Sequence, residues 1–307
     1  MSAQGENTGP LAGVKILDLT IWQNGPFATV MLGDLGAEII KIEDRTTGDP
    51  GRGFMDVGAT SGVSGYFEAM NRNKRSVTLD LKAPEGREVF YKLAAQVDVV
   101  VQNFRYGVAE KLKIAYADLV PHNPKLIYAS ATGFGRQGPD AKMGVFDILG
   151  QARSGVLQAL RAPGDAVEYN NSFGLADQTG GILLAQAITT ALFARERSGE
   201  GQEVEISQLG SLLILQQMGI TRHLINGYEP APGLRHAPKN PVFNTYECAG
   251  GDWIAVGGLQ GDRYWTDMCA ILGLPELGSD PRYATLAQRT AESTAEIHQI
   301  IDNVQTG

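Results

Sequence analysis

Residues 14–43 read VKILDLTIWQNGPFATVMLGDLGAEIIKIE, and the pattern of apolar residues changes along this stretch. An apolar run over 14–19 predicts a buried strand. Residues 27–35 are mostly apolar and predict a helix that ends at a glycine, and a second apolar strand follows over 38–42. A strand, a helix and a strand in this order predict a parallel pair, because parallel neighbours need a crossover connection.

The same alternation continues through the first half of the chain. Further strands are predicted over 76–81, 97–102 and 125–131, with helical patterns over 84–95 and 108–119. This pattern specifies an α/β fold in which helices cover both faces of a parallel sheet. Ligands of such sheets bind beyond the carboxyl ends of the strands. We therefore expect the site in the loops after Leu19, Ile42, Gln102 and Ala131.

The second half of the chain predicts a smaller domain behind a linker. A long apolar helix over 178–197, a strand over 202–206 and a further helix complete the first domain. Four prolines without periodicity then mark a linker. Two alternating strands and two helical patterns follow it, over 242–248, 252–256, 263–272 and 291–304. The expected organisation is a large domain over 10–225, a linker over 226–241 and a small α+β domain over 242–307.

Charge and hydropathy exclude several classes of partner. The chain carries 26 basic and 34 acidic residues, a formal net charge of −8, so its surface repels nucleic acid and anionic lipid. The longest uncharged, mostly apolar run, over 178–194, is shorter than the roughly 20 residues of a membrane span. The first residues lack the basic and apolar regions of a signal peptide. We expect a cytoplasmic protein that binds neither nucleic acid nor membrane.

The motifs of several common cofactors are missing or incomplete. Cys248 and Cys269 lack metal-ligand spacing and are predicted to be core residues, and the four histidines form no paired ligand pattern. Residues 133–138 fit G-x-G-x-x-G, but Gly138-Pro139 predicts a turn where a dinucleotide site needs a helix. We therefore expect no metal, no NAD and no flavin.

A basic cluster stands out in this acidic chain. Arg72, Lys74 and Arg75 precede a predicted strand, and three cations together could hold phosphates. A solvated turn is the alternative interpretation. Arg45 and Lys82 each follow a neighbouring strand and are predicted to lie on the same sheet edge as the cluster.

Asp177 precedes the long apolar helix and has two compatible interpretations. It could cap the helix, because an aspartate carboxylate accepts the unpaired amides of a first turn. A carboxylate at a helix N-terminus is also held ionised. Gly180 and Gly181 would then let an acyl group approach backbone N–H donors that stabilise an oxyanion. Asp147 and the glycine-rich residues 257–261 are more simply caps and turns.

Taken together, several segments resemble the class III CoA-transferase family, typified by formyl-CoA transferase. The resemblance implies a Rossmann-like large domain, a smaller domain and a homodimer of two chains interlocked as rings. Family members continue well past residue 307, so we expect the segment that returns to the large domain to be missing here. The matching segments are residues 11–20 with Gly25-Pro26, 35–43, Gly48-Asp49, 71–76, 98–104, 133–139, 177–181 and 197–204.

The same resemblance implies which residues carry the reaction. Asp177 falls on the catalytic aspartate, and Gln23 falls on a glutamine that orders the acyl intermediates. Asp44 stands where formyl-CoA transferase has a basic CoA contact, and neighbouring Arg45 is expected to replace it. With Gly180 and Gly181 added to the catalytic set, the expected CoA contacts are Arg45, Arg72, Lys74, Arg75, Lys82, Asn103, Phe104 and Lys111.

The implied activity is transfer of CoA from an acyl-CoA to a free carboxylic acid through aspartyl anhydride and aspartyl-CoA intermediates. Coenzyme A is then a substrate. Related α-methylacyl-CoA racemases need a histidine before the acid at Asp147, and here that residue is Phe146. The alternatives are a racemase, an acyl-CoA lyase, or an inactive truncated CoA-binding module.

Overall fold

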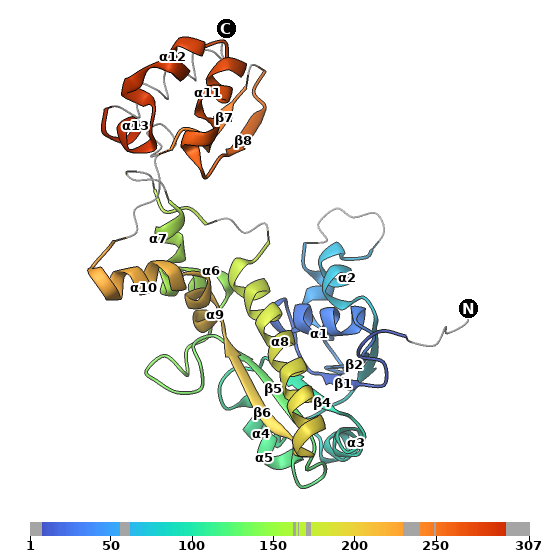
Figure 1. The fold of residues 1–307 in the computed structure, drawn as a ribbon. Helices are drawn as coiled ribbons and strands as arrows, with labels where there is room; N and C mark the ends of the chain where they lie inside the picture. Colours follow the sequence, from blue (N-terminus) through green and yellow to red (C-terminus); the bar gives the residue numbers. More distant parts are fainter. Residues whose placement is uncertain are drawn as a thin grey trace. The chain divides into compact units, whose positions relative to one another are not determined.

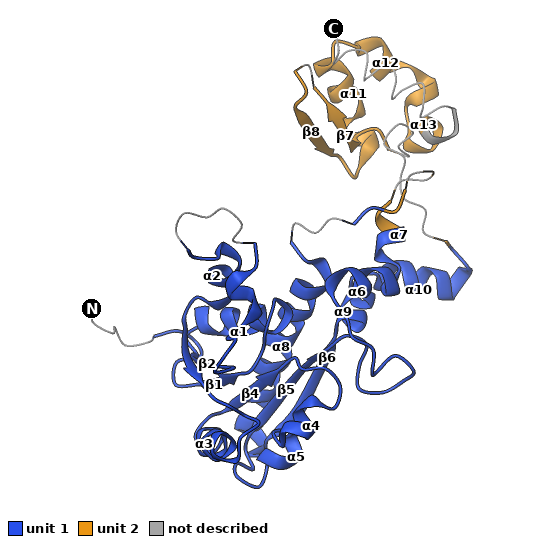
Figure 2. Cartoon of the chain, turned by 180° about the vertical axis from the view of Figure 1, so that it is seen from behind, with its two compact units in different colours: residues 1–158, 168–228 blue, residues 159–167, 229–307 orange. Residues whose placement is uncertain are grey.

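The computed structural model describes residues 8–55, 62–161, 164, 166–169, 173–229, 240–248 and 250–292. The chain divides into two compact units, residues 1–158 with 168–228 and residues 159–167 with 229–307 (Figure 2). Most of the predicted linker, residues 230–239, lies outside the described residues. The domain boundaries at 226–241 therefore stay a prediction.

Unit 1 is built on six parallel strands in the order β3-β2-β1-β4-β5-β6 (Figure 1). This is the Rossmann order, and it confirms the predicted α/β class. The chain order reverses between β1 and β4. The elements are β1 (Lys15–Asp18), α1 (Asn24–Asp34), β2 (Glu38–Glu43), η1 (Pro50–Gly53), α2 (Gly65–Asn71), β3 (Lys74–Thr78), α3 (Pro84–Ala94), β4 (Val99–Gln102), α4 (Val108–Leu112), α5 (Tyr116–Leu119), β5 (Ile127–Thr132), α6 (Asp147–Ser154), α8 (Leu175–Ser198), β6 (Gln202–Ser207), α9 (Gln208–Leu215) and α10 (Gln217–Asn226). Helix α7 (Val156–Leu160) begins in unit 1 and ends in unit 2.

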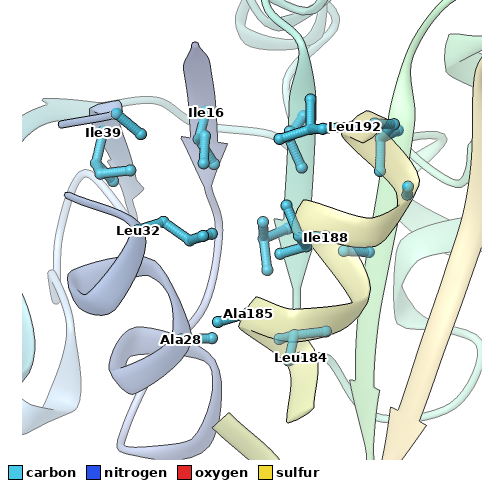
Figure 3. Packing of buried hydrophobic residues seen from close by; sticks show 14 of the residues in the cluster. Ile16, Ala28, Leu32, Ile39, Leu184, Ala185, Ile188 and Leu192 are labelled. Atoms are coloured by element: carbon cyan, nitrogen blue, oxygen red, sulfur yellow. The ribbon is translucent and has the colours of Figure 1, made fainter. Parts of the chain in front are cut away.

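The four inner strands, β1, β2, β4 and β5, are largely buried, and their successive residues point to opposite faces of the sheet. On one face Ile16 packs in a cluster with α1 and α8, where Ala28 and Ala185 lie close together (Figure 3). On the other face Leu17 packs in a second cluster with residues of α3, α4 and α5, including Phe90. The inner strands thus contribute apolar residues to both faces, as buried parallel strands require.

Two elements begin earlier than the sequence predicts, and two predicted helices are each divided in the structure. Strand β3 begins at Lys74 rather than at residue 76, and α8 begins at Leu175 rather than at residue 178. The predicted helix over 108–119 is two helices, because Lys113 adopts a left-handed conformation with φ 59°. The helix predicted after β6 likewise divides at Gln216 into α9 and α10.

Unit 2 is a small α+β structure, as predicted. Strands β7 (Phe243–Glu247) and β8 (Trp253–Gly257) pair antiparallel, and α11 (Gly261–Ile271), α12 (Pro275–Ser279), η2 (Pro281–Tyr283) and α13 (Leu286–Glu292) follow them. Trp265 and Cys269 lie in its core, which confirms the prediction for Cys269. Of the helix predicted over 291–304, residues 293–304 lie outside the described part of the chain.

Candidate active site

A cavity of about 340 Å³ opens at the carboxyl edge of the sheet, where the strand order reverses between β1 and β4. Open α/β sheets bind their ligands at this switch point. The walls come from the loops after β1, β4 and β5 and from the starts of α8 and α9. Among the lining residues are Ile21, Trp22, Asn24, Gln102, Asn103, Phe104, Arg105, Phe146, Asp177 and Gln208.

Asn103 fixes the two loops that flank the switch point. Its Oδ1 accepts from the Ile21 N–H over 2.9 Å, and its Nδ2 donates to the Ile21 carbonyl over 2.8 Å. Gln102 Oε1 accepts from the Phe104 N–H over 2.7 Å. The structure therefore brings two predicted CoA contacts, Asn103 and Phe104, to the cavity wall, where Asn103 holds the neighbouring loop by its backbone.

The first turn of α8 is capped from outside its own segment. The N–H groups of Ala176 and Asp177 donate to Asp147 Oδ1 over 2.7 and 3.0 Å. The second oxygen of Asp147 accepts from Gln151 Nε2 and from the Tyr169 hydroxyl, over 2.5 and 3.1 Å. The interpretation of Asp177 as the helix cap is thus wrong, because Asp147 of α6 binds these amides. The Asp177 carboxylate is left to face the cavity.

Asp177 is held by an amide, and no cation of the described residues neutralises its charge. Gln208 Nε2 donates to Asp177 Oδ1, and within the described residues no lysine or arginine forms an ion pair with this carboxylate. Burial, together with the negative charge of Asp147, raises the pKa of Asp177 to about 7, although the Gln208 hydrogen bond lowers it. A cavity carboxyl group whose pKa is shifted by burial and a neighbouring charge is a candidate functional group.

Gly180 and Gly181 lie inside α8 and not at its start. Because helical amides donate to the carbonyl four residues back, neither offers a free N–H, and their expected role as oxyanion donors is wrong. Their small size serves helix packing instead. A Cβ on Gly180 would overlap Asn24 Nδ2, and one on Gly181 would lie 2.8 Å from the Asn24 carbonyl and 2.9 Å from the Phe27 ring. The two glycines therefore let α1 approach α8 closely.

Gln23 is the residue before α1, and its side chain contacts the segment that leads into α8. Its Nε2 donates to the Phe173 carbonyl over 2.9 Å. A Cβ on Gly174 would lie 2.7 Å from the Gln23 amide. Gln23 thus links the starts of α1 and α8, whereas the next residue, Asn24, lines the cavity.

The basic cluster lies at the amino edge of the sheet, opposite the cavity. Residues that precede a parallel strand lie at this edge, and β3 begins at Lys74. Arg72 pairs with Asp34, and Arg75 with Glu38. The structure therefore does not bring Arg72 or Arg75 to the site.

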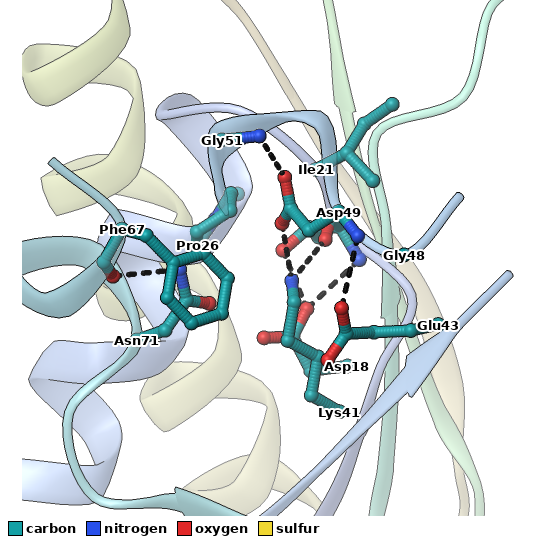
Figure 4. Close-up of polar contacts among 12 residues, drawn as sticks. Asp18, Ile21, Pro26, Lys41, Glu43, Gly48, Asp49, Gly51, Phe67 and Asn71 are labelled. Carbon is teal, nitrogen blue, oxygen red and sulfur yellow. Dashed lines mark hydrogen bonds and ion pairs between the residues drawn. The ribbon is translucent and has the colours of Figure 1, made fainter. Parts of the chain in front are cut away.

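Lys74 is a buried structural cation. Its side chain is 2% exposed, and its Nζ lies 3.0 Å from Asp18 Oδ2. Nearby, Lys41 Nζ lies 2.7 Å from Asp49 Oδ2, which ties the loop after β2 to the strand (Figure 4). The prediction of Lys74 as a CoA contact is not supported, because its ammonium group is enclosed by protein acceptors.

The other expected CoA contacts lie at or near the cavity edge of the sheet without lining the cavity. Arg45 and Lys82 are exposed in the loops after β2 and β3, and Lys111 is exposed on α4. The sequence prediction missed Asn24 and Gln208, which line the cavity, and Arg105 at its wall. Arg105 directly follows Phe104 in a loop that was predicted to form the site. Its position in the sequence could therefore have identified it as a site residue.

Two further properties concern the described part of the chain alone. Its His, Cys, Asp and Glu side chains form no group of three or more that could hold a metal ion. Its helices include none that is both long enough and apolar enough to cross a membrane.

The sheet order and the carboxylate at its switch point define an α/β enzyme of Rossmann-like topology. Residues 11–306 match the model of CoA-transferase family III, so the chain belongs to this family and is an enzyme of the CoA-transferase class. It is 35% identical to the acetyl-CoA:oxalate CoA-transferase of Acetobacter aceti, over 94% of this chain and 73% of that protein. It is 34% identical to the succinyl-CoA:mesaconate CoA-transferase of Haloarcula hispanica, over 96% and 74%.

Solved structures show the same fold. A CAIB/BAIF family protein from Brucella suis superposes with a TM-score of 0.85 and 31% identity, over 97% of this chain and 78% of that one. The hypothetical protein Rv3272 of Mycobacterium tuberculosis gives a TM-score of 0.84 and 30% identity, over 98% and 79%.

Proposed function

We propose that this chain transfers CoA between carboxylic acids and that Asp177 carries the acyl group during transfer. The observation that supports this most directly is the Asp177 carboxylate itself. It lines the switch-point cavity, is held at one oxygen by Gln208, and forms no ion pair with a cation of the described chain. A carboxylate fixed in this way is a nucleophile whose attack on a thioester gains from positioning.

The reaction conserves the thioester energy at each step. Asp177 attacks the donor carbonyl carbon, the C–S bond breaks, and a mixed anhydride and CoA thiolate form. The thiolate attacks the aspartyl carbonyl, which gives an aspartyl-CoA thioester and releases the donor acid. The acceptor carboxylate attacks this thioester, and the released thiolate then attacks the acceptor carbonyl of the new anhydride. This gives the new acyl-CoA and the free Asp177 carboxylate.

CoA would be held by groups along the carboxyl edge of the sheet. Asn103 and Phe104 form part of the cavity wall, and the exposed cations Arg45, Lys82 and Lys111 are available to its phosphates. Arg105 at the cavity wall is a further cation for an anionic substrate group. Trp22 and Phe146, whose ring centroids are 6.5 Å apart, supply an apolar wall for the acyl chain.

The relatives suggest the class of acids. Their names pair acetyl-CoA or succinyl-CoA with oxalate, mesaconate or glutarate. We propose short dicarboxylic acids as acceptors for this chain as well. A panel of acyl-CoA donors crossed with mono- and dicarboxylic acids, analysed by mass spectrometry, would identify the pair.

A homodimer and a cytoplasmic location belong to the same proposal. The dimer follows from the family resemblance. Sedimentation equilibrium of the full-length protein should give twice the mass of one chain. Cell fractionation should recover the protein with cytoplasmic markers.

The direct test is to trap the acyl-enzyme. Incubation with an acyl-CoA, quenching with hydroxylamine and digestion should give an aspartyl hydroxamate on the peptide that contains Asp177. Asp140, which pairs with Arg153 outside the cavity, offers a matched control: the D140N protein should still be labelled at Asp177. A protein that turns over acyl-CoA but carries no label at Asp177 would rule out the covalent route.

A further inference from the structure

Asn24 is a buried polar residue that the reaction scheme above leaves unused. It is the first residue of α1 and is 6% exposed. Neither its Nδ2 nor its Oδ1 has a hydrogen-bond partner among the described residues. Buried polar atoms nearly always have partners, so an unpartnered carboxamide calls for an explanation.

The carboxamide of Asn24 lies beside the turn that carries Asp177. Asn24 Nδ2 occupies the space that a Cβ on Gly180 would enter. Because Cα–Cβ bonds of a helix tilt toward its N-terminus, this space lies over the turn that contains Asp177, three residues earlier. Asn24 and Asp177 also line the same cavity. The amide is therefore close to the atom that would attack a substrate.

The attack on a thioester needs a hydrogen-bond donor that the backbone of α8 does not provide. The amides of Ala176 and Asp177 are bound to Asp147, and that of Gln178 to the Gly174 carbonyl. Gly180 and Gly181 are within the helix. Asn24 Nδ2 is a buried donor at this place whose hydrogens have no acceptor among the described residues.

We propose that Asn24 is a catalytic residue whose Nδ2 donates a hydrogen bond to the carbonyl oxygen of the bound thioester. As Asp177 forms its C–O bond, the carbonyl electron pair moves to that oxygen, and the Asn24 donor stabilises the negative charge until the C–S bond breaks. No proton is transferred in this step. The amide can turn about χ2 toward the cavity without losing a hydrogen bond, because it has none in the described structure. This inference rests on the proposed function.

The principal test is the variant Asn24→Leu, which keeps the size of the side chain and removes the donor. We expect kcat to fall by about 10²-fold to 10³-fold, as when one oxyanion donor is lost, with little change in KM for acyl-CoA. Single-turnover formation of the Asp177 hydroxamate should slow by the same factor. The folded state is checked by the melting temperature.

Asn71 provides a matched control, since it is a buried asparagine of α2 that donates to the Phe67 carbonyl over 3.0 Å. Asn71→Leu should lower stability while the acylation rate per folded molecule is unchanged. Should Asn24→Leu fail to fold, the pair Asn24→Ser and Asn24→Ala replaces it. The serine variant keeps a donor and should acylate about fivefold faster than the alanine variant.

The outcomes separate this inference from the proposed function. If Asp177 is labelled in the wild type and equally fast in Asn24→Leu, the catalytic role of Asn24 is wrong and the buried amide is a structural or water-binding group. Equal rates in the serine and alanine variants lead to the same conclusion. If the wild type itself gives no hydroxamate at Asp177 during turnover, the proposed function fails, and the role of Asn24 fails with it.

Discussion

Asp18 lies among cations, whereas Asp177 lies beside a second carboxylate. Burial tends to raise the pKa of Asp18, but the charges of Lys74 and Lys41, with hydrogen bonds from Thr20 and Thr29, lower it to about 2. For Asp177, burial and the charge of Asp147 act in the same direction and raise the pKa to about 7. Both carboxyl groups belong to the same unit, and burial contributes to the pKa of each.

The difference shows what decides the use of a buried aspartate in this fold. An ionised carboxylate whose oxygens accept hydrogen bonds from ammonium and hydroxyl groups, as in Asp18, holds strands and loops together. Its oxygens are occupied and are not available as nucleophiles. A carboxylate held by one amide keeps an oxygen available and lines the cavity. The predictions below test this contrast between Asp18 and Asp177.

Asp177→Asn should have the largest effect. We expect CoA transfer to fall by about 10³-fold or more, because the nucleophile is lost, while the variant still folds and binds CoA. The measurement is steady-state transfer together with calorimetric CoA binding. A folded variant that retains turnover within tenfold of the wild type would contradict the role of Asp177.

Asp18→Asn should act on stability instead. The substitution leaves the Lys74 ammonium buried without its carboxylate, which costs about 3–5 kcal/mol of unfolding free energy. Denaturant unfolding measures this loss. The control is Asp34→Asn, which breaks the exposed Arg72 pair and should cost about 1 kcal/mol or less.

The two aspartates also predict opposite pH effects. Asp18 has a lowered pKa, so its stabilising contribution is present above its ordinary value of 3.8 and is lost as the pH falls toward about 2. Acid unfolding of the wild type and of Asp18→Asn should therefore converge in this range. If the stability difference between the two proteins stays constant down to about pH 2, Asp18 does not titrate as described.

Asp177 must be ionised to attack, and its pKa is raised to about 7. The rate of hydroxamate formation should therefore rise about tenfold per pH unit below this value and level off above it. Gln208 lowers the pKa of Asp177, so Gln208→Leu should move the whole profile to higher pH. A profile that is flat from about pH 5 to pH 9 would contradict the raised pKa.

The smallest effects concern single surface cations at the two edges of the sheet. Lys82→Ala, at the cavity edge, should weaken CoA binding by about fivefold at most, because an exposed ion pair contributes little. Arg75→Ala, at the amino edge, should leave CoA affinity unchanged. Calorimetry at low and high salt measures both, and a larger loss for Arg75 would restore the basic cluster to the site.

Much of this fold could be predicted because buried parallel strands are locally apolar. The strands around Ile16 and Val100 and the long helix α8 are examples, since each is recognisable from its own residues. Lys74 was predicted to precede β3, whereas it is the first residue of that strand. Its ion pair with Asp18 could not be predicted from local sequence, because the two residues are more than fifty positions apart.

The site could be predicted only in part, because some of its contacts join residues that are far apart in the sequence. Asp177, Asn103 and Phe104 carry motifs that identify them in the sequence. Asn24 and Gln208 stand out only through the hydrogen bonds that their side chains make or lack in the folded chain. No local sequence pattern predicts these hydrogen bonds. Gly180 illustrates the reverse case, because a glycine that looked suited to expose its amide is required by the close approach of α1.

The capping of α8 by Asp147 also affects how the protein meets small anions. The positive end of a helix ordinarily attracts phosphate or sulfate from the buffer. Here the Asp147 carboxylate already accepts from the amides of Ala176 and Asp177, so a free anion would have to compete with it for these donors. The start of α8 therefore leaves fewer free amides for an inorganic anion to bind.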